Sequence, residues 1–158
     1  MFTAMLILIV STALFFFFIQ VTCMKLLRRR FDRDYHLAIA NANRLEYLSV
    51  RKAIEEFNLP VDYARVRMTL KCDFLALTYL LKNAVNARRR YRFEEWLLMA
   101  HFRAILLWLS VCHALRLREQ PLILRLTAIL QYFANVVGQR FESLRFGNAA
   151  VSDYLVNL

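Results

Sequence analysis

The chain has 158 residues, of which 59% are hydrophobic, above the share of about 45–50% that is usual in globular proteins. This composition argues against disorder, and the presence of only two glycines and two prolines argues against a turn-rich β fold. We therefore expect an all-α protein with room for one domain beside a membrane segment. The net charge of +10 predicts an anionic partner, and three separated cysteines without a CxxC pair argue against a disulfide framework or a zinc site.

Residues 1–24 are expected to form a transmembrane anchor. The run from Phe2 to Met24 carries no charge. As a helix it would reach roughly 35 Å, enough to cross a hydrocarbon core of about 30 Å. A cleavable secretory signal fits less well, because no basic residue precedes the run and no small-residue cleavage pattern follows it. The sequence therefore predicts an uncleaved anchor.

Residues 25–34 form a basic juxtamembrane collar. Basic flanks of a span stay on the cytoplasmic side, and the N-terminal side of this span offers only the amino group. We therefore expect the N-terminus outside and the rest of the chain in the cytoplasm. Basic residues beside a span attract anionic lipid headgroups. The collar residues expected to do so are Lys25, Arg28, Arg29, Arg30 and Arg33.

Residues 35–148 are predicted to form an antiparallel bundle of about four helices. Pro60 ends the first helix, because proline disfavours helix at the residue before it. Pro121 suits the first turn of the last helix, and Gly147 with Asn148 is typical of a helix stop. The predicted helices cover 35–57, 61–86, 93–117 and 121–146, followed by a C-terminal tail at 149–158.

A second basic cluster lies at the end of the second predicted helix. Residues 61–92 carry eight basic and two acidic residues. If the first two helices form a hairpin about Pro60, the end of the second returns toward the collar. The two clusters would then share one membrane-proximal face that binds anionic lipid. The members of the second cluster are Lys82, Arg88, Arg89, Arg90 and Arg92.

The last two predicted helices raise a three-span alternative. Their uncharged stretches, 104–115 and 126–139, have the length of buried core helices and not of spans. Extending either stretch to about 20 residues includes Arg103 or Arg125, and an arginine costs about 2.5–3.5 kcal/mol near the centre of a span. We therefore expect one span and a bundle, with three spans as the alternative.

The chain carries no recognisable catalytic motif and no phosphate-binding loop. His101 and His113 are twelve residues apart, so their side chains diverge by about 120° on a straight helix and would not share a metal. We therefore expect neither enzymatic activity nor a cofactor, with a cofactor-binding or enzymatic subunit using either histidine as the alternative. The sequence "ARRRYRF" would suit nucleic acid, but no helix-turn-helix or zinc pattern supports that use.

These observations favour a membrane-anchored adaptor, scaffold or accessory subunit of a membrane complex. Its partners would be anionic lipid and either another protein or a second copy of the chain. A membrane-tethered nucleic-acid binder remains a further alternative.

Overall fold

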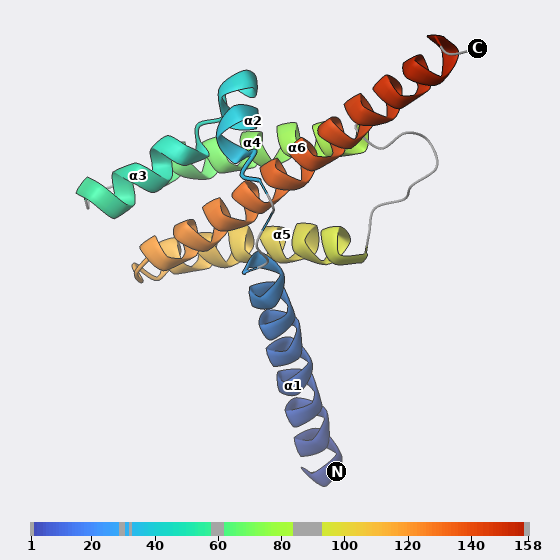
Figure 1. Ribbon diagram of the computed structural model, residues 1–158. Helices are drawn as coiled ribbons and strands as arrows, with labels where there is room; N and C mark the ends of the chain where they lie inside the picture. The colour runs from blue at the N-terminus through green and yellow to red at the C-terminus, as the bar shows by residue number, and fades with distance from the viewer. Residues whose placement is uncertain (1, 29–30, 32, 58–61, 84–92, 157–158) are drawn as a thin grey trace.

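The computed structural model describes residues 2–28, 31, 33–57, 62–83 and 93–156. This part of the chain contains six helices and no strands, so the predicted all-α class is confirmed. An apolar N-terminal helix precedes a helical bundle (Figure 1). The helices are α1 (Phe2–Leu27), α2 (His36–Asn43), α3 (Tyr47–Phe57), α4 (Tyr63–Asn83), α5 (Phe93–Ala114) and α6 (Gln120–Val156).

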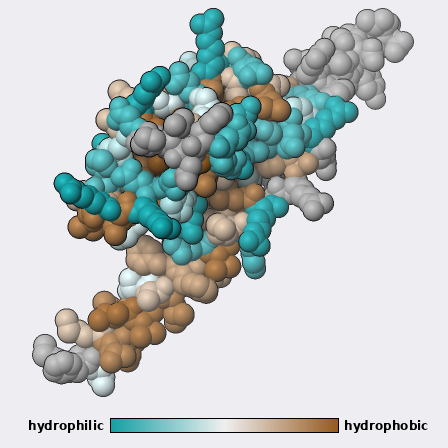
Figure 2. Space-filling model, turned by 90° about the vertical axis from the view of Figure 1, so that its left-hand side faces the viewer, coloured by the Kyte–Doolittle hydropathy of each residue, from teal (hydrophilic) through white to brown (hydrophobic). Residues whose placement is uncertain are grey.

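Helix α1 projects from the bundle as a separate rod (Figure 1). Every side chain from Thr3 to Phe18 is exposed. The space-filling view shows this rod as a hydrophobic extension beneath a largely hydrophilic bundle (Figure 2). Only the last turns of α1 contact the bundle, where they pack against α5 and α6.

Helix α6 is the centre of the bundle and contacts α2, α3, α4 and α5. Large side chains of its first half are fully buried, which accounts for the uncharged stretch at 126–139. The core extends from α6 into α4 and α5, where the rings of Phe74 and Phe102 stack with their centroids 4.2 Å apart. The fully buried residues of this stretch include Leu126, Ile129, Leu130 and Phe133.

Helices α4 and α5 run antiparallel. The ring of Tyr63, at the start of α4, stacks on the ring of His113, at the end of α5, with centroids 3.8 Å apart. Atom Nδ1 of His113 also lies 2.7 Å from a carboxylate oxygen of Glu119, in the connection to α6. At this end of the bundle, His113 therefore links the start of α4, the end of α5 and the connection to α6.

The single helix predicted at 35–57 is wrong, because the chain turns between α2 and α3. Arg44 adopts a left-handed conformation with φ of 52°, and the Leu45 N–H donates to the Ala40 carbonyl at 2.9 Å. The new helix is capped from outside its own sequence. One carboxylate oxygen of Asp73, in α4, accepts the N–H groups of Glu46 at 3.0 Å and Tyr47 at 2.7 Å. This buried cap stabilises the turn between α2 and α3, which the local sequence does not predict.

Helix α2 is capped in the same manner by α6. The side-chain oxygen of Asn135 accepts the N–H groups of Tyr35 at 2.9 Å and His36 at 2.8 Å. One turn further on, Gly138 lies so close to Tyr35 that a Cβ at position 138 would meet the Tyr35 Cβ at 2.2 Å. The cap by Asn135 and the absence of a side chain at Gly138 together allow α2 to pack closely on α6. We name α2, α3 and the turn between them the α2–α3 corner.

Two predicted helix ends also differ from the structure. Helix α6 continues through Gly147 and Asn148 to Val156, so the predicted stop there is wrong and most of the predicted tail is helical. Helix α5 ends at Ala114, earlier than predicted, because Arg116 takes a left-handed conformation with φ of 53°. The Leu117 N–H then donates to the Cys112 carbonyl at 2.9 Å, which closes the helix end.

Candidate membrane-contact surface

The described chain contains three helices that are long and apolar enough to cross a membrane. The first, Thr3–Leu27, has a mean hydropathy of 2.5, and none of its most apolar window is buried within the protein. The other two are Phe93–Ala114, 28% buried, and Gln120–Glu142, 67% buried. Length and composition therefore identify three candidates, whereas the fraction buried within the protein differs strongly among them.

The last turns of α1 form a junction with the bundle. A narrow crevice of about 50 Å³ lies there between α1, α5 and α6. Cys23, on α1, is fully buried at the same level of the helix. Residues on α1 that line the crevice include the polar Gln20, while His101 and Arg125 bring polar groups from the other two helices. The junction is thus an apolar contact with polar groups at its margin.

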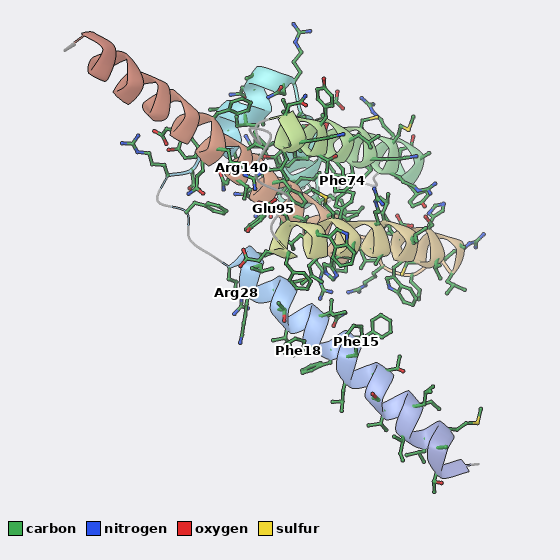
Figure 3. The ribbon with its side chains drawn as sticks, turned by 90° about the vertical axis from the view of Figure 1, so that its right-hand side faces the viewer. Phe15, Phe18, Arg28, Phe74, Glu95 and Arg140 are labelled. Atoms are coloured by element: carbon green, nitrogen blue, oxygen red, sulfur yellow. The ribbon has the colours of Figure 1, made fainter. Side chains whose placement is uncertain are left out.

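The basic residues predicted to bind lipid are only partly described. Lys25 and Arg28 are exposed at the end of α1, where Figure 3 labels Arg28. Arg33 is exposed and forms an ion pair with Glu142 on α6 at 3.1 Å. Lys82 is exposed at the end of α4. The remaining predicted residues, Arg29, Arg30, Arg88, Arg89, Arg90 and Arg92, lie outside the described residues, and their lipid contact stays a prediction.

Four further arginines are exposed around α5 and the start of α6. Arg103 lies on α5, Arg116 and Arg118 lie in the following turn, and Arg125 lies in the second turn of α6. In the sequence alone, Arg103 and Arg125 count against a span. Each of them directly precedes an uncharged stretch, 104–115 or 126–139, and this position at the edge of an apolar run was the signal that could have marked them as candidate residues for a membrane boundary.

Charged side chains form contacts within the bundle, one of which joins α5 to α6. Glu95 is almost fully buried and forms an ion pair with Arg140 (Figure 3). A cleft of about 460 Å³ lies between the collar, α3 and α6. Arg51, at its edge, donates to the side-chain oxygen of Gln131 at 2.5 Å and to Glu55 at 2.9 Å. The pairs Glu95–Arg140 and Arg51–Gln131 join separate helices, whereas Arg51 and Glu55 both belong to α3.

The described part of the chain holds no group of three or more potential metal-ligating side chains. His101 lies at the junction crevice, whereas His113 is engaged by Tyr63 and Glu119, so the structure keeps the two histidines apart. All three cysteines are free; Cys23 and Cys112 are buried, and Cys72 is exposed.

Burial raises the pKa of the Asp73 carboxyl above its ordinary value, an effect that the hydrogen bonds from Tyr47 and Glu46 partly oppose. Burial, together with the nearby Asp73, also raises the pKa of the Tyr47 hydroxyl. Both groups lie outside the three candidate spans, in the α2–α3 corner and in the helix that caps it, and both of these elements pack against α6.

No protein-family profile, curated protein or solved structure matches this chain.

Proposed function

We propose that this protein is a membrane-anchored helical adaptor, scaffold or accessory subunit of a membrane protein complex, with α1 as its single span. The observation that carries the proposal is the contrast between an exposed apolar α1 and a bundle that buries its own core. So much apolar surface on one helix favours a lipid environment. The basic residues Lys25 and Arg28 at the end of α1 support a cytoplasmic bundle and an external N-terminus.

A three-span subunit is the second candidate, favoured by the length and hydropathy of Phe93–Ala114 and Gln120–Glu142. Two observations weigh against it. Most of the second segment is buried inside the protein, and α5 lies crosswise to α1 (Figure 1). Neighbouring spans normally cross at shallow angles.

Cysteine labelling in intact cells separates the two topologies. We expect a cysteine replacing Arg118, in a Cys72→Ser background, to react only after the membrane is opened. A cysteine placed before Thr3 is the control and should react from outside. Labelling of position 118 from outside would establish the three-span topology instead.

The adaptor role is tested by affinity purification of the full chain from native membranes, followed by mass spectrometry. We expect at least one protein in a fixed ratio to the chain. The matched control carries an unrelated apolar span of equal length in place of α1. Partners that the bundle holds should remain in the control, whereas partners bound through α1 should be lost. Purification of the chain without any partner at a fixed ratio would contradict the role.

The purified material also tests the other functional classes. Stoichiometric haem or metal, seen by absorption spectroscopy and elemental analysis, would favour a cofactor-binding subunit. Nucleic acid that is retained at low salt and released at high salt would favour a tethered nucleic-acid binder.

Contact with anionic lipid is tested on the full chain in vesicles. We expect Arg88→Gln with Arg89→Gln to lower the preference for spin-labelled phosphatidylserine over spin-labelled phosphatidylcholine by about fivefold or more, since each arginine near a surface contributes about 1 kcal/mol. The control replaces two exposed basic residues of the α2–α3 corner, Arg44→Gln with Lys52→Gln. If both pairs of substitutions lower the lipid preference equally, the effect comes from net charge alone and the proposed lipid contact of the second basic cluster is contradicted.

A further inference from the structure

Helix α5 has two apolar faces, and only one of them belongs to the core. One face is buried and includes Leu98, Phe102 and Leu109. On the opposite side large apolar residues are exposed, and the only polar residues among the exposed positions of α5 are Arg103 and His113. The large residues of this outer face are Phe93, Trp96, Leu107, Trp108 and Val111, with exposed fractions from 43% to 72%. We call them the outer face of α5.

The outer face lies at the level where α1 leaves the apolar phase. At about 1.5 Å per residue, a hydrocarbon core of about 30 Å takes up about 20 residues, so a span that begins at Thr3 ends near Thr22. Helix α5 packs against this part of α1, where Gln20 and Met24 share the junction crevice with Ile105. Both ribbon views place α5 on the side of the bundle from which α1 departs (Figures 1 and 3).

The side chains match the chemistry of a membrane interface. Trp96 and Trp108 are the only tryptophans of the chain, and both are exposed on the outer face. Tryptophan is enriched at headgroup level, where its ring meets both apolar and polar surroundings. Arg103, Arg118 and Arg125 are exposed nearby in the chain and would complement anionic headgroups. A long arginine side chain also reaches the headgroups from a helix that lies slightly deeper.

We propose that α5 is an interfacial helix that lies along the membrane crossed by α1, with its outer face against the acyl chains of phospholipid. The inference rests on the proposed single span. The outer face lies opposite the side of α5 that packs on α4 through Phe102 and Phe74, and α5 lies on the side of the bundle from which α1 departs. This placement favours lipid over a second copy of the chain or another protein as its occupant. The protein is thereby held by a span and by a helix in the plane of the membrane, which together fix the orientation of the bundle.

The two tryptophans allow the orientation of α5 relative to the membrane to be measured in the full chain. Trp96→Phe and Trp108→Phe each leave one fluorophore, and neither removes a buried side chain. Each variant is reconstituted in vesicles of phosphatidylcholine brominated either near the headgroup or near the chain end. For an interfacial α5, both tryptophans are quenched to the same extent, and the bromine near the headgroup quenches more.

The other arrangements give different patterns. Twelve residues, about 18 Å along a helix, separate the tryptophans, so a spanning α5 would put them on opposite sides of the bilayer centre. Trp108, nearer the middle of α5, would then be quenched more by the bromine near the chain end than Trp96. A face that is covered by protein or exposed to water would leave both unquenched. Either result would overturn the inference. An alkaline carbonate wash of the same vesicles tests α1 separately, because release of the chain would also contradict the proposed anchor, whereas retention without quenching contradicts only the role of α5.

Discussion

Helices α5 and α6 are close equals by composition and opposites by environment. Their candidate spans have 22 and 23 residues and mean hydropathies of 1.5 and 1.3, yet 28% of one and 67% of the other are buried in the protein. The apolar residues of α6 are covered by the helices around it, whereas α5 is covered mainly on one side. Hydropathy measures how much apolar surface a helix has, and only the fold determines what covers it.

The largest expected effect comes from a matched pair of leucines. Leu130 on α6 is 0% exposed and Leu107 on α5 is 66% exposed. Leu130→Ala should lower the free energy of unfolding by about 2–5 kcal/mol, because it removes buried contacts and leaves a cavity. Leu107→Ala should change it by less than about 0.5 kcal/mol in detergent. Chemical unfolding followed by circular dichroism measures both, and equal losses would remove the distinction between the helices.

The next largest difference in stability is expected between substitutions that place a larger side chain on α6 and on α5. Gly138→Ala places a methyl group against the Cβ of Tyr35, so we expect a loss of about 1–3 kcal/mol despite the better helix propensity of alanine. Ala104→Leu adds more volume on the exposed side of α5 and should be tolerated. A thermal unfolding series in one detergent tests the pair. If Gly138→Ala stabilises the protein, α2 is not docked as closely as described.

A smaller effect is expected at the cap of the α2–α3 corner, which covers part of α6. Asp73→Ala leaves two backbone N–H groups without their acceptor and should cost about 0.5–2 kcal/mol. Asp73→Asn keeps a carbonyl acceptor and should cost less.

The pH dependence follows from the raised pKa of Asp73. Because the folded protein binds the Asp73 proton more tightly than the unfolded chain, stability should fall as the pH rises from 3.8 through the raised pKa. Asp73→Asn should lack this contribution, so its stability relative to the native chain should improve over the same range. The free energy of unfolding of both proteins, measured at several pH values, tests this expectation. If the stability of Asp73→Asn relative to the native chain falls as the pH rises, the pKa of Asp73 is not raised.

The smallest expected effect is at the turn between α5 and α6. Arg116 holds a left-handed backbone conformation that glycine adopts without strain. Arg116→Gly should therefore stabilise the protein by up to about 1 kcal/mol. Arg118→Gly, two residues on and without a positive φ, should destabilise it slightly. A gain of stability in both variants would mean that the strain does not lie at position 116.

The parts of the fold that follow from local pattern could be predicted from the sequence. The uncharged run predicts α1, and regular apolar spacing predicts α4. The two left-handed breaks could not be predicted, because they use arginine where glycine is usual, at Arg44 and Arg116, while α6 continues through Gly147.

The candidate membrane surface shows the same division. The end of α1 and its basic flank could be read directly from the sequence. The outer face of α5 could not be assigned, because both sides of this helix are apolar and only the packing of Phe102 against Phe74 shows which side is the core. Pairing of the two predicted basic clusters rests on residues outside the described part and stays a prediction.

The caps of the α2–α3 corner also set an order of events during synthesis. The corner follows α1 directly, but Asp73 is 26 residues beyond Tyr47, and Asn135 is 100 residues beyond Tyr35. When α1 leaves the ribosome, the backbone groups behind it have not yet met their acceptors. Translation must reach α6 before α2 can dock. The α2–α3 corner is thus made early but docks late, which leaves its backbone groups accessible to chaperones or partner subunits through most of translation.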